Sequence, residues 1–128
     1  MIENPEITLK ILRIYARDET PWPANYCVED IVRLTDDFER NVIEYHLICA
    51  IKSELLQGSV NKTSTLDGNL YTFGYIDGLT AKGSEYVCNS ENPEVWNKAK
   101  DYLISAGLKI TTDKSYTAVS NVVQNITS

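Results

Sequence analysis

The sequence has few basic side chains and a single histidine among its 128 residues. Twelve lysines and arginines stand against 18 aspartates and glutamates, so the formal net charge is −6 and the isoelectric point is about 4.7. A protein that binds duplex DNA without sequence preference usually presents a broad basic surface to the phosphates. The composition therefore excludes a generic DNA-coating protein, and any contact with DNA must come from a local basic patch.

Paired cysteines are also missing. Cys27, Cys49 and Cys88 stand at wide, irregular spacing without a CxxC pair, and each has apolar neighbours in the sequence. This pattern predicts reduced thiols in the core rather than disulfides. His46 and Cys49 are three positions apart, so they could share a helix face and hold a metal with a distant cysteine. That is the weaker interpretation, and we predict no metal and no cofactor.

Catalytic motifs and long apolar runs are absent as well. The chain has no glycine-rich phosphate loop, no HExxH and no GxSxG. Acidic pairs such as Glu29-Asp30 and Asp36-Asp37 stand at expected helix starts, where the helix dipole explains them. There is no basic leader, and no apolar run reaches the roughly 20 residues that cross a bilayer. We expect a soluble, non-catalytic protein of the cytoplasm with no membrane partner.

Helical periodicity dominates the first half of the chain. Apolar residues at helical spacing predict one helix over Pro5–Arg17 and a second over Val28–Leu34. Between them, Asp18 to Tyr26 contains two prolines and cannot continue a helix. We expect a loop there, pinned by Trp22.

The longest helical pattern runs from Asp36 to Leu56. Thr35 is the expected N-cap, followed by acidic residues that suit the start of a helix. One stripe should be buried, formed by Ile43, Leu47, Ala50, Ile51 and Leu55. The outer face would carry Glu39, Arg40, Glu44, His46, Lys52 and Ser53.

After Leu56 the sequence pattern changes from helical spacing to one typical of β-strands. Gly58–Val60 and Leu70–Ile76 are rich in residues that favour extended structure, and Asp67-Gly68 between them is a turn signal. This pattern predicts a β-hairpin with a polar tip over residues 61–69, which carries Lys62 as its basic residue. The alternating aromatic residues Tyr71, Phe73 and Tyr75 could stack on bases, but they are expected to cover the core or an interface.

Three further helices are expected in the last third. One opens at Leu79-Thr80 and runs to about Cys88, and the next begins at Asn92-Pro93 and stops at Gly107. A terminal helix, capped by Thr112 or Asp113, must bury its apolar stripe. The stripe could pack back on the domain or against a second copy.

These elements predict an α+β, mostly α fold: a winged helix-turn-helix with a β-hairpin wing and additional C-terminal helices. We interpret residues 1–128 as a single domain, with a core over about 5–90 and a C-terminal helical extension over about 92–127.

Three segments carry a family resemblance. Tyr45-His46-Leu47 with Leu55-Leu56-Gln57-Gly58 comes first, Gly78-Leu79-Thr80 with Gly83 second, and Val95-Trp96-Asn97-Lys98 third. Over about Ile43 to Leu103 the chain resembles a family of uncharacterised winged-helix proteins of phages, prophages and Firmicute genomes. The resemblance implies a winged-helix fold and a mobile-element setting, but no activity or site residues. The chain departs from the family pattern at Ala81 and Lys82, where tryptophan and glutamate are expected.

Two functions fit this predicted fold. The first is a DNA-binding transcriptional regulator of a phage, prophage or mobile element, which would contact double-stranded DNA through the long helix and the wing. Its candidate contact residues are Arg40, Asn41, Tyr45, Lys52 and Lys62. A homodimer through the terminal helix would suit such a regulator.

The alternative is an acidic adaptor or inhibitor that binds a basic host protein. Its candidate residues stand at the start of the same helix: Asp36, Asp37, Glu39 and Glu44. These carboxylates would repel DNA phosphates, so they favour the alternative.

Overall fold

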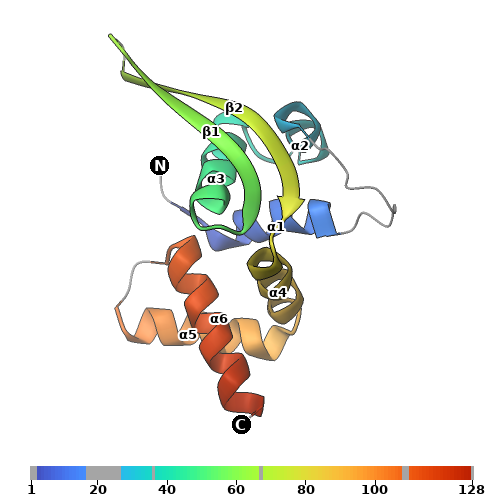
Figure 1. The fold of residues 1–128 in the computed structure, drawn as a ribbon. Coiled ribbons are helices and arrows are strands. Elements are labelled where there is room, and N and C mark those ends of the chain that lie inside the picture. Colours follow the sequence, from blue (N-terminus) through green and yellow to red (C-terminus); the bar gives the residue numbers. More distant parts are fainter. Residues whose placement is uncertain (1–2, 17–26, 36, 67, 108–109, 128) are drawn as a thin grey trace.

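The protein is described by a computed structural model that covers residues 3–16, 27–35, 37–66, 68–107 and 110–127 (Figure 1). The elements follow in the order α1 (Pro5–Ala16), α2 (Val28–Leu34), α3 (Arg40–Lys52), β1 (Leu56–Thr65), β2 (Gly68–Leu79), α4 (Ala81–Ser90), α5 (Pro93–Ser105) and α6 (Thr112–Thr127). The predicted α+β, mostly helical class is confirmed. Arg17 and the loop Asp18–Tyr26 with Trp22 lie outside the described residues.

Helix α1 lies at the centre of the molecule. It packs against α3 and β2 on one side and against α4 and α6 on the other (Figure 1). Its apolar residues at helical spacing explain this position, because Leu9, Ile11 and Leu12 are all buried. The predicted first helix and the predicted bounds of α2 are confirmed.

Helix α3 begins later than the sequence pattern predicted. Thr35 is not its N-cap, since the Thr35 hydroxyl donates to the carbonyl of Ile31 at 2.6 Å and closes α2 instead. The N-cap is Glu39, whose side chain makes no capping hydrogen bond. Asp36 lies outside the described residues, and Asp37 precedes the helix.

Helix α3 also ends earlier than predicted, at Lys52 rather than Leu56. Glu54 takes a left-handed conformation with φ 63°. The N–H of Leu55 then donates to Ala50 O at 2.9 Å, and the N–H of Glu54 donates to Ile51 O at 3.0 Å. This is the hydrogen-bond pattern of a Schellman C-cap, in which glycine is the usual left-handed residue. Because glutamate occupies this position, no glycine marks the end of α3 in the sequence.

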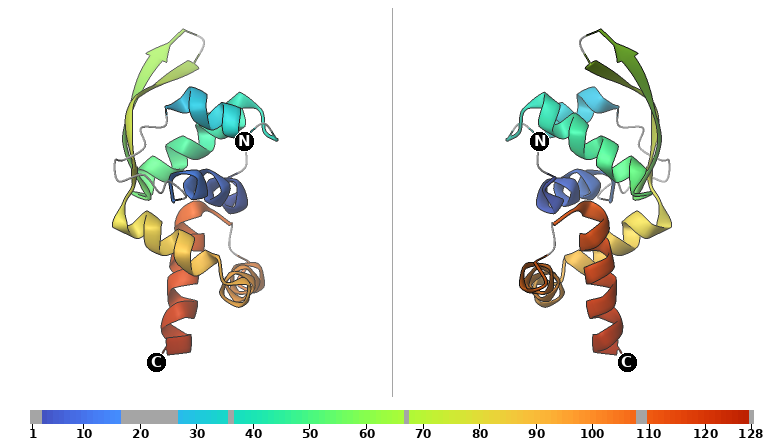
Figure 2. Two further views of the ribbon diagram at one scale, coloured as in Figure 1. Left: turned by 90° about the vertical axis from the view of Figure 1, so that its right-hand side faces the viewer. Right: turned by 90° about the vertical axis from the view of Figure 1, so that its left-hand side faces the viewer.

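The hairpin is longer than predicted. β1 and β2 pair antiparallel from Leu56↔Leu79 to Thr65↔Gly68, so the polar stretch expected as a tip loop is part of the ladder. The turn lies between Thr65 and Gly68, and Gly68 has φ 122°, which glycine adopts readily. The register shifts twice, between Gln57 and Gly58 and between Gly58 and Val60. These bulges accompany the bend of the hairpin (Figures 1 and 2).

Helices α4 and α5 begin at side-chain caps. Thr80 caps α4 by accepting from the N–H of Gly83 at 2.9 Å, and Asn92 caps α5 by accepting from the N–H of Glu94 at 3.0 Å. The predicted Asn92-Pro93 start is confirmed, and so is the stop at Gly107, which has φ 68°. Leu79 closes β2 instead of opening α4.

Helix α6 packs back on α4 and α5, which was one of the two packings left open by the sequence. Its cap is Thr111 rather than Thr112 or Asp113, because the Thr111 hydroxyl accepts from the N–H of Lys114 at 3.2 Å. The C-terminal end of α6 projects beyond the other helices, at the opposite end of the molecule from the hairpin tip (Figure 2).

One cluster of buried side chains joins the whole described chain. It takes residues from every helix and from both strands, including Ile31, Ile43, Leu56, Ile76 and Val119. The predicted stripe of α3 is buried at Ile43, Leu47 and Ala50, while Leu55 is buried beyond the helix end. None of the described helices combines the length and apolar character that a membrane span requires.

The cysteines are free thiols, but they are not all core residues as predicted. Cys27 and Cys88 are exposed, and Cys49 is partly buried. Burial raises the pKa of the Cys49 thiol to about 12, so this thiol stays protonated and is a poor nucleophile and metal ligand.

Candidate functional site

An open groove of about 570 Å³ separates the hairpin from the first turns of α2 and α3. Residues 71–77 of β2 form one wall, and the opposite wall consists of Cys27, Val28, Glu29, Arg40 and Glu44. We call this feature the hairpin groove. Its β2 wall carries all three of the alternating aromatic residues noted in the sequence. Phe73 packs partly on the core, whereas the Tyr75 side chain is 54% exposed.

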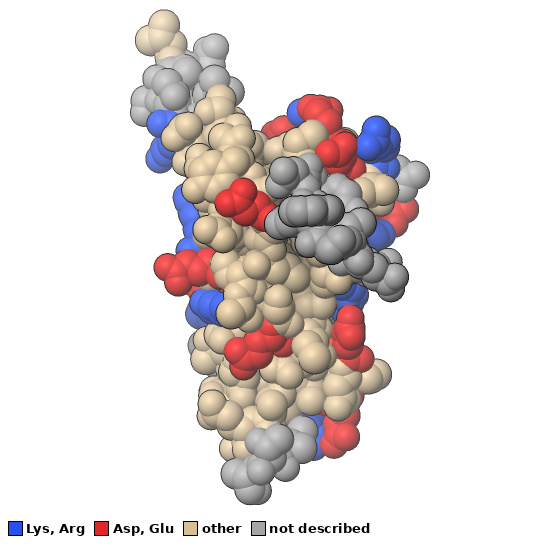
Figure 3. Space-filling model, turned by 45° about the vertical axis from the view of Figure 1, so that its right-hand side comes forward, with Lys and Arg blue, Asp and Glu red and all other residues tan. Residues whose placement is uncertain are grey.

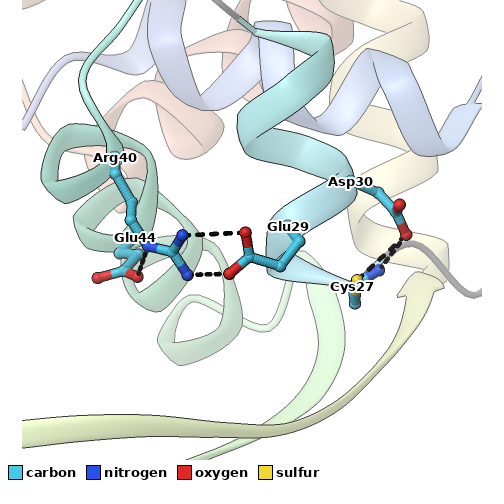
Figure 4. Close-up of polar contacts among 5 residues, drawn as sticks. All are labelled: Cys27, Glu29, Asp30, Arg40 and Glu44. Carbon is cyan, nitrogen blue, oxygen red and sulfur yellow. Dashed lines mark hydrogen bonds and ion pairs between the residues drawn. The ribbon is translucent and has the colours of Figure 1, made fainter.

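Arg40 is held in the hairpin groove by two carboxylates (Figure 4). One guanidinium nitrogen donates to Glu29 at 3.0 Å and a second donates to the other oxygen of the same carboxylate. The Arg40 Nε donates to Glu44 at 2.9 Å. The bidentate contact crosses from α3 to α2, so it also fixes the positions of the two helix starts relative to each other.

Charges in the hairpin groove do not balance. Among the described residues that line it, Glu29, Glu44 and Asp77 stand against one cation, Arg40. The hydrogen bonds that Arg40 donates to Glu29, and then the one to Glu44, raise the pKa of Arg40. The hydrogen bond from Arg40 likewise lowers the pKa of Glu29. Three carboxylate side chains thus stand against one guanidinium among the described lining residues, and this part of the groove is electronegative.

The other predicted DNA-contacting residues of α3 do not gather in the hairpin groove. Asn41 is exposed, and its side-chain oxygen accepts from the N–H of Val42 at 2.9 Å. Tyr45 lies edge-on to His46, with ring centroids 5.2 Å apart, and burial raises the pKa of its hydroxyl. Tyr45 also hydrogen-bonds with Cys49, so its polar end is engaged within the protein.

The predicted acidic residues of the protein-binding alternative separate in the same way. Asp37 forms an ion pair with Lys10 of α1, and that ammonium lies 5.2 Å from the centre of the Phe38 ring. Glu39 is exposed, and Glu44 alone lines the hairpin groove. Asp36 lies outside the described residues.

His46 is buried, which corrects its predicted place on the outer face of α3. It is 1% exposed, and its Nε2 accepts from the N–H of Asn4 at 2.9 Å. Its Nδ1 therefore carries the proton and donates to Val42 O at 2.8 Å. Both ring nitrogens are occupied. Within the residues that the structure describes, no group of three histidine, cysteine, aspartate or glutamate side chains is placed to hold a metal ion.

Three lysines form a second candidate surface, which we call the lysine row: Lys62 on β1, Lys52 on α3 and Lys82 on α4. Lys62 is directly opposite Tyr71 in the ladder, and the Lys52 ammonium lies 5.7 Å from the centre of the Tyr71 ring. The Lys82 ammonium donates to Ser53 O at 3.0 Å and lies 4.6 Å from the centre of the Tyr116 ring. Tyrosine rings thus accompany the row.

The space-filling view shows how unevenly the charges are distributed (Figure 3). Basic groups follow the left edge of this view from the hairpin downward, with an acidic group among them. Acidic groups are more frequent over the rest of the face, which is otherwise largely uncharged. The net charge of −6 therefore coexists with a local basic edge.

Sequence reasoning missed Glu29, Asp77 and Lys82. Glu29 was interpreted as a helix-start residue, and only the packing of α2 beside α3 turns it toward Arg40. Lys82 had a signal in the sequence, because it stands where the resemblance predicted a glutamate. Lys52 and Lys62 were predicted as contact residues, and the structure places both beside Tyr71.

Comparison with known proteins adds one match. No curated protein and no solved structure shows significant similarity to the chain. Residues 11–109 match the DUF2513 family of hypothetical proteins. This segment includes α2, α3, the hairpin, α4 and α5, together with both candidate surfaces. Because the match covers well over half of the chain, the protein belongs to the DUF2513 family.

Proposed function

We propose that this protein is a winged-helix DNA-binding protein, a non-catalytic regulator of a phage, prophage or other mobile element. The order of three helices followed by a hairpin supports the winged-helix assignment. The mobile-element setting is supported by the resemblance of the YHL, GLT and VWNK segments. The hairpin is the wing, and α3 is the helix beside it.

The lysine row is the observation that carries this proposal. Three ammonium groups from the hairpin, α3 and α4 lie along one edge, and two of them are held over tyrosine rings. Lysines that contact DNA phosphates release the counterions of those phosphates. The aromatic rings restrict the lysine side chains, which lowers the entropy lost when they meet DNA.

The start of α3 contributes less to DNA binding than the corresponding helix start does in helix-turn-helix proteins. Arg40 is already engaged by Glu29 and Glu44, and both carboxylates would repel phosphates. Binding at this end of α3 requires Arg40 to exchange its carboxylate partners for DNA. We therefore assign the main contacts to Lys52, Lys62 and Lys82, with Arg40 and Asn41 as secondary ones.

The test is fluorescence anisotropy with a labelled random-sequence duplex across a range of salt concentrations. The triple variant Lys52→Gln, Lys62→Gln, Lys82→Gln should weaken binding and reduce the slope of log affinity against log salt by about 0.9 for each lost phosphate contact. Lys98→Gln, Lys100→Gln, Lys114→Gln is the matched control, because it removes the same charge from α5 and α6.

Two results contradict the proposal. One is the absence of any DNA binding by the unmodified protein at low salt. The other is an equal loss of affinity in the control variant, which would show that total charge rather than the lysine row decides binding. Selection of tightly bound duplexes from the same random pool then tests sequence preference.

A homodimer through α6 remains part of the proposal. The projecting end of this helix (Figure 2) offers a place for a second copy. Sedimentation equilibrium of the full chain, alone and with duplex DNA, measures the oligomeric state directly.

A further inference from the structure

From the hairpin groove we infer a second binding site, separate in function from the lysine row: it docks an arginine side chain on a segment of a partner protein. The groove has a volume of about 570 Å³ and opens to solvent between the helix starts and the hairpin. Its lining combines exposed aromatic surface with carboxylates. Such a combination fits a ligand group that is both cationic and flat.

The charge of the groove determines whether its ligand is a cation or an anion. Of the lining residues that the structure describes, Glu29, Glu44 and Asp77 stand against one cation, Arg40, so two negative charges among them remain unbalanced. A cationic side chain would be attracted, whereas a phosphate would be repelled. For this reason nucleic acid is not the occupant of the groove, although Tyr71 borders both candidate surfaces.

Arg40 shows what kind of cation the carboxylates accept. Its guanidinium lies flat between Glu29 and Glu44, bidentate to the first and singly bonded to the second (Figure 4). A planar fork of donors matches this arrangement, and it also stacks on aromatic faces such as that of Tyr75, which is 54% exposed. An ammonium group can lie over an aromatic ring but has no planar fork of donors, so arginine is preferred over lysine.

The geometry of β2 favours recognition through side chains over addition of a strand. β2 is an edge of the two-stranded sheet that the described residues form. Both register shifts, however, fall in the part of the ladder that faces the groove, between Phe73 and Gly78. Bulges interrupt the regular alternation of N–H and C=O groups that an added strand needs. The partner therefore inserts a side chain rather than extending the sheet.

The experiment uses the ¹⁵N-labelled full chain and a capped hexapeptide with one central arginine between leucines. The matched peptide replaces arginine with citrulline, which keeps the shape but removes the charge. We expect the arginine peptide to shift the amide resonances of residues 71–77 and of the first turns of α2 and α3. The dissociation constant should be about 1 mM or lower. The citrulline peptide should bind about fivefold more weakly or worse.

Protein variants distinguish binding in the groove from attraction by the overall negative charge of the protein. Glu29→Gln, Glu44→Gln should lower the affinity for the arginine peptide about fivefold or more. Glu85→Gln, Glu91→Gln removes the same charge from exposed positions in and after α4, and should change affinity less than twofold. Lys52→Gln, Lys62→Gln should leave peptide binding intact, so this site and the DNA site can fail independently.

Three outcomes would overturn the inference. The arginine peptide could fail to shift the groove resonances, the two peptides could bind equally well, or the two glutamate pairs could affect binding equally. Amide resonances outside the groove serve as the folding check, since an intact spectrum shows that a variant has lost binding and not structure.

Discussion

Arg40 and Glu29 form a bidentate ion pair that joins the start of α3 to the start of α2. The contact is exposed, with side-chain exposures of 51% and 67%. Its contribution to stability is therefore screened by solvent. The larger effect of this ion pair is electrostatic. Glu29 neutralises Arg40, the cation at the start of α3 that lines the hairpin groove.

This pairing predicts that removing the carboxylates will strengthen DNA binding. In the variant Glu29→Gln, Glu44→Gln, Arg40 loses both ionic partners and two phosphate-repelling charges disappear. We expect the affinity for duplex DNA at low salt to rise about three- to tenfold, with a steeper salt dependence. Anisotropy titration measures both. If Glu85→Gln, Glu91→Gln raises the affinity as much, the effect comes from net charge and not from Arg40.

The sequence predicted the elements better than their ends. Helical spacing identified the six helices that the structure describes, because each buries apolar residues. The start of α3 was misplaced because threonine can close one helix as well as open the next, and Thr35 bonds backward to Ile31. The hairpin was predicted too short because Thr63 and Thr65 were grouped with polar loop residues, although β-branched residues favour strands.

The candidate site was predicted less well, for a different physical reason. Lys52 and Lys62 were identified from their elements, but the partners of a charged residue depend on packing between elements. Arg40 was expected to be available for DNA, and nothing in the sequence places Glu29, eleven positions earlier, against its guanidinium. His46 was misplaced likewise, because its partner Asn4 lies 42 positions away.

Gly83 is predicted to tolerate no side chain. A Cβ at this position would lie 2.1 Å from Leu55 O, a backbone atom in the connection between α3 and β1. Gly83→Ala must therefore push α4 away from this connection and disturb the Thr80 cap. We expect a loss of about 2–4 kcal/mol in the free energy of unfolding by urea.

Ser84→Ala is the control for this glycine, since the next residue of the same helix is exposed. It should change the free energy of unfolding by less than about 0.5 kcal/mol. Equal effects of the two substitutions would mean that helix propensity, and not the close approach to Leu55, governs this position.

Glu3 is predicted to give the protein part of its acid sensitivity. Partial burial opposes ionisation of this carboxylate, but hydrogen bonds, above all from the Thr112 N–H at the start of α6, lower its pKa below 4.5. A carboxylate with a lowered pKa in the folded state stabilises the protein above its unfolded pKa, and the effect is lost as pH falls through the folded pKa. The stabilisation is therefore complete at neutral pH and decreases below pH 4.5.

Glu3→Gln keeps an acceptor for the Thr112 N–H but removes the charge. Urea unfolding should show the variant less stable than the unmodified protein at neutral pH, with a difference that shrinks toward about pH 3. The exposed variant Glu91→Gln corrects for the loss of one charge. A difference that stays constant over this range would show that the ionised form of Glu3 has no preferred partner.

The last prediction concerns the buried hydroxyl pair that ties α4 to α6. Tyr86 is fully buried, and its hydroxyl lies 2.6 Å from the Ser115 hydroxyl, which is also buried. Removing one partner leaves the other without a hydrogen bond in a dry environment, so Tyr86→Phe and Ser115→Ala should each cost about 1–3 kcal/mol of unfolding free energy. The double variant removes both polar groups and should cost clearly less than the sum of the single variants. Urea denaturation of all four proteins closes this cycle. Additive losses would mean that each hydroxyl is satisfied independently of the other, and that apolar packing alone holds α6 against α4.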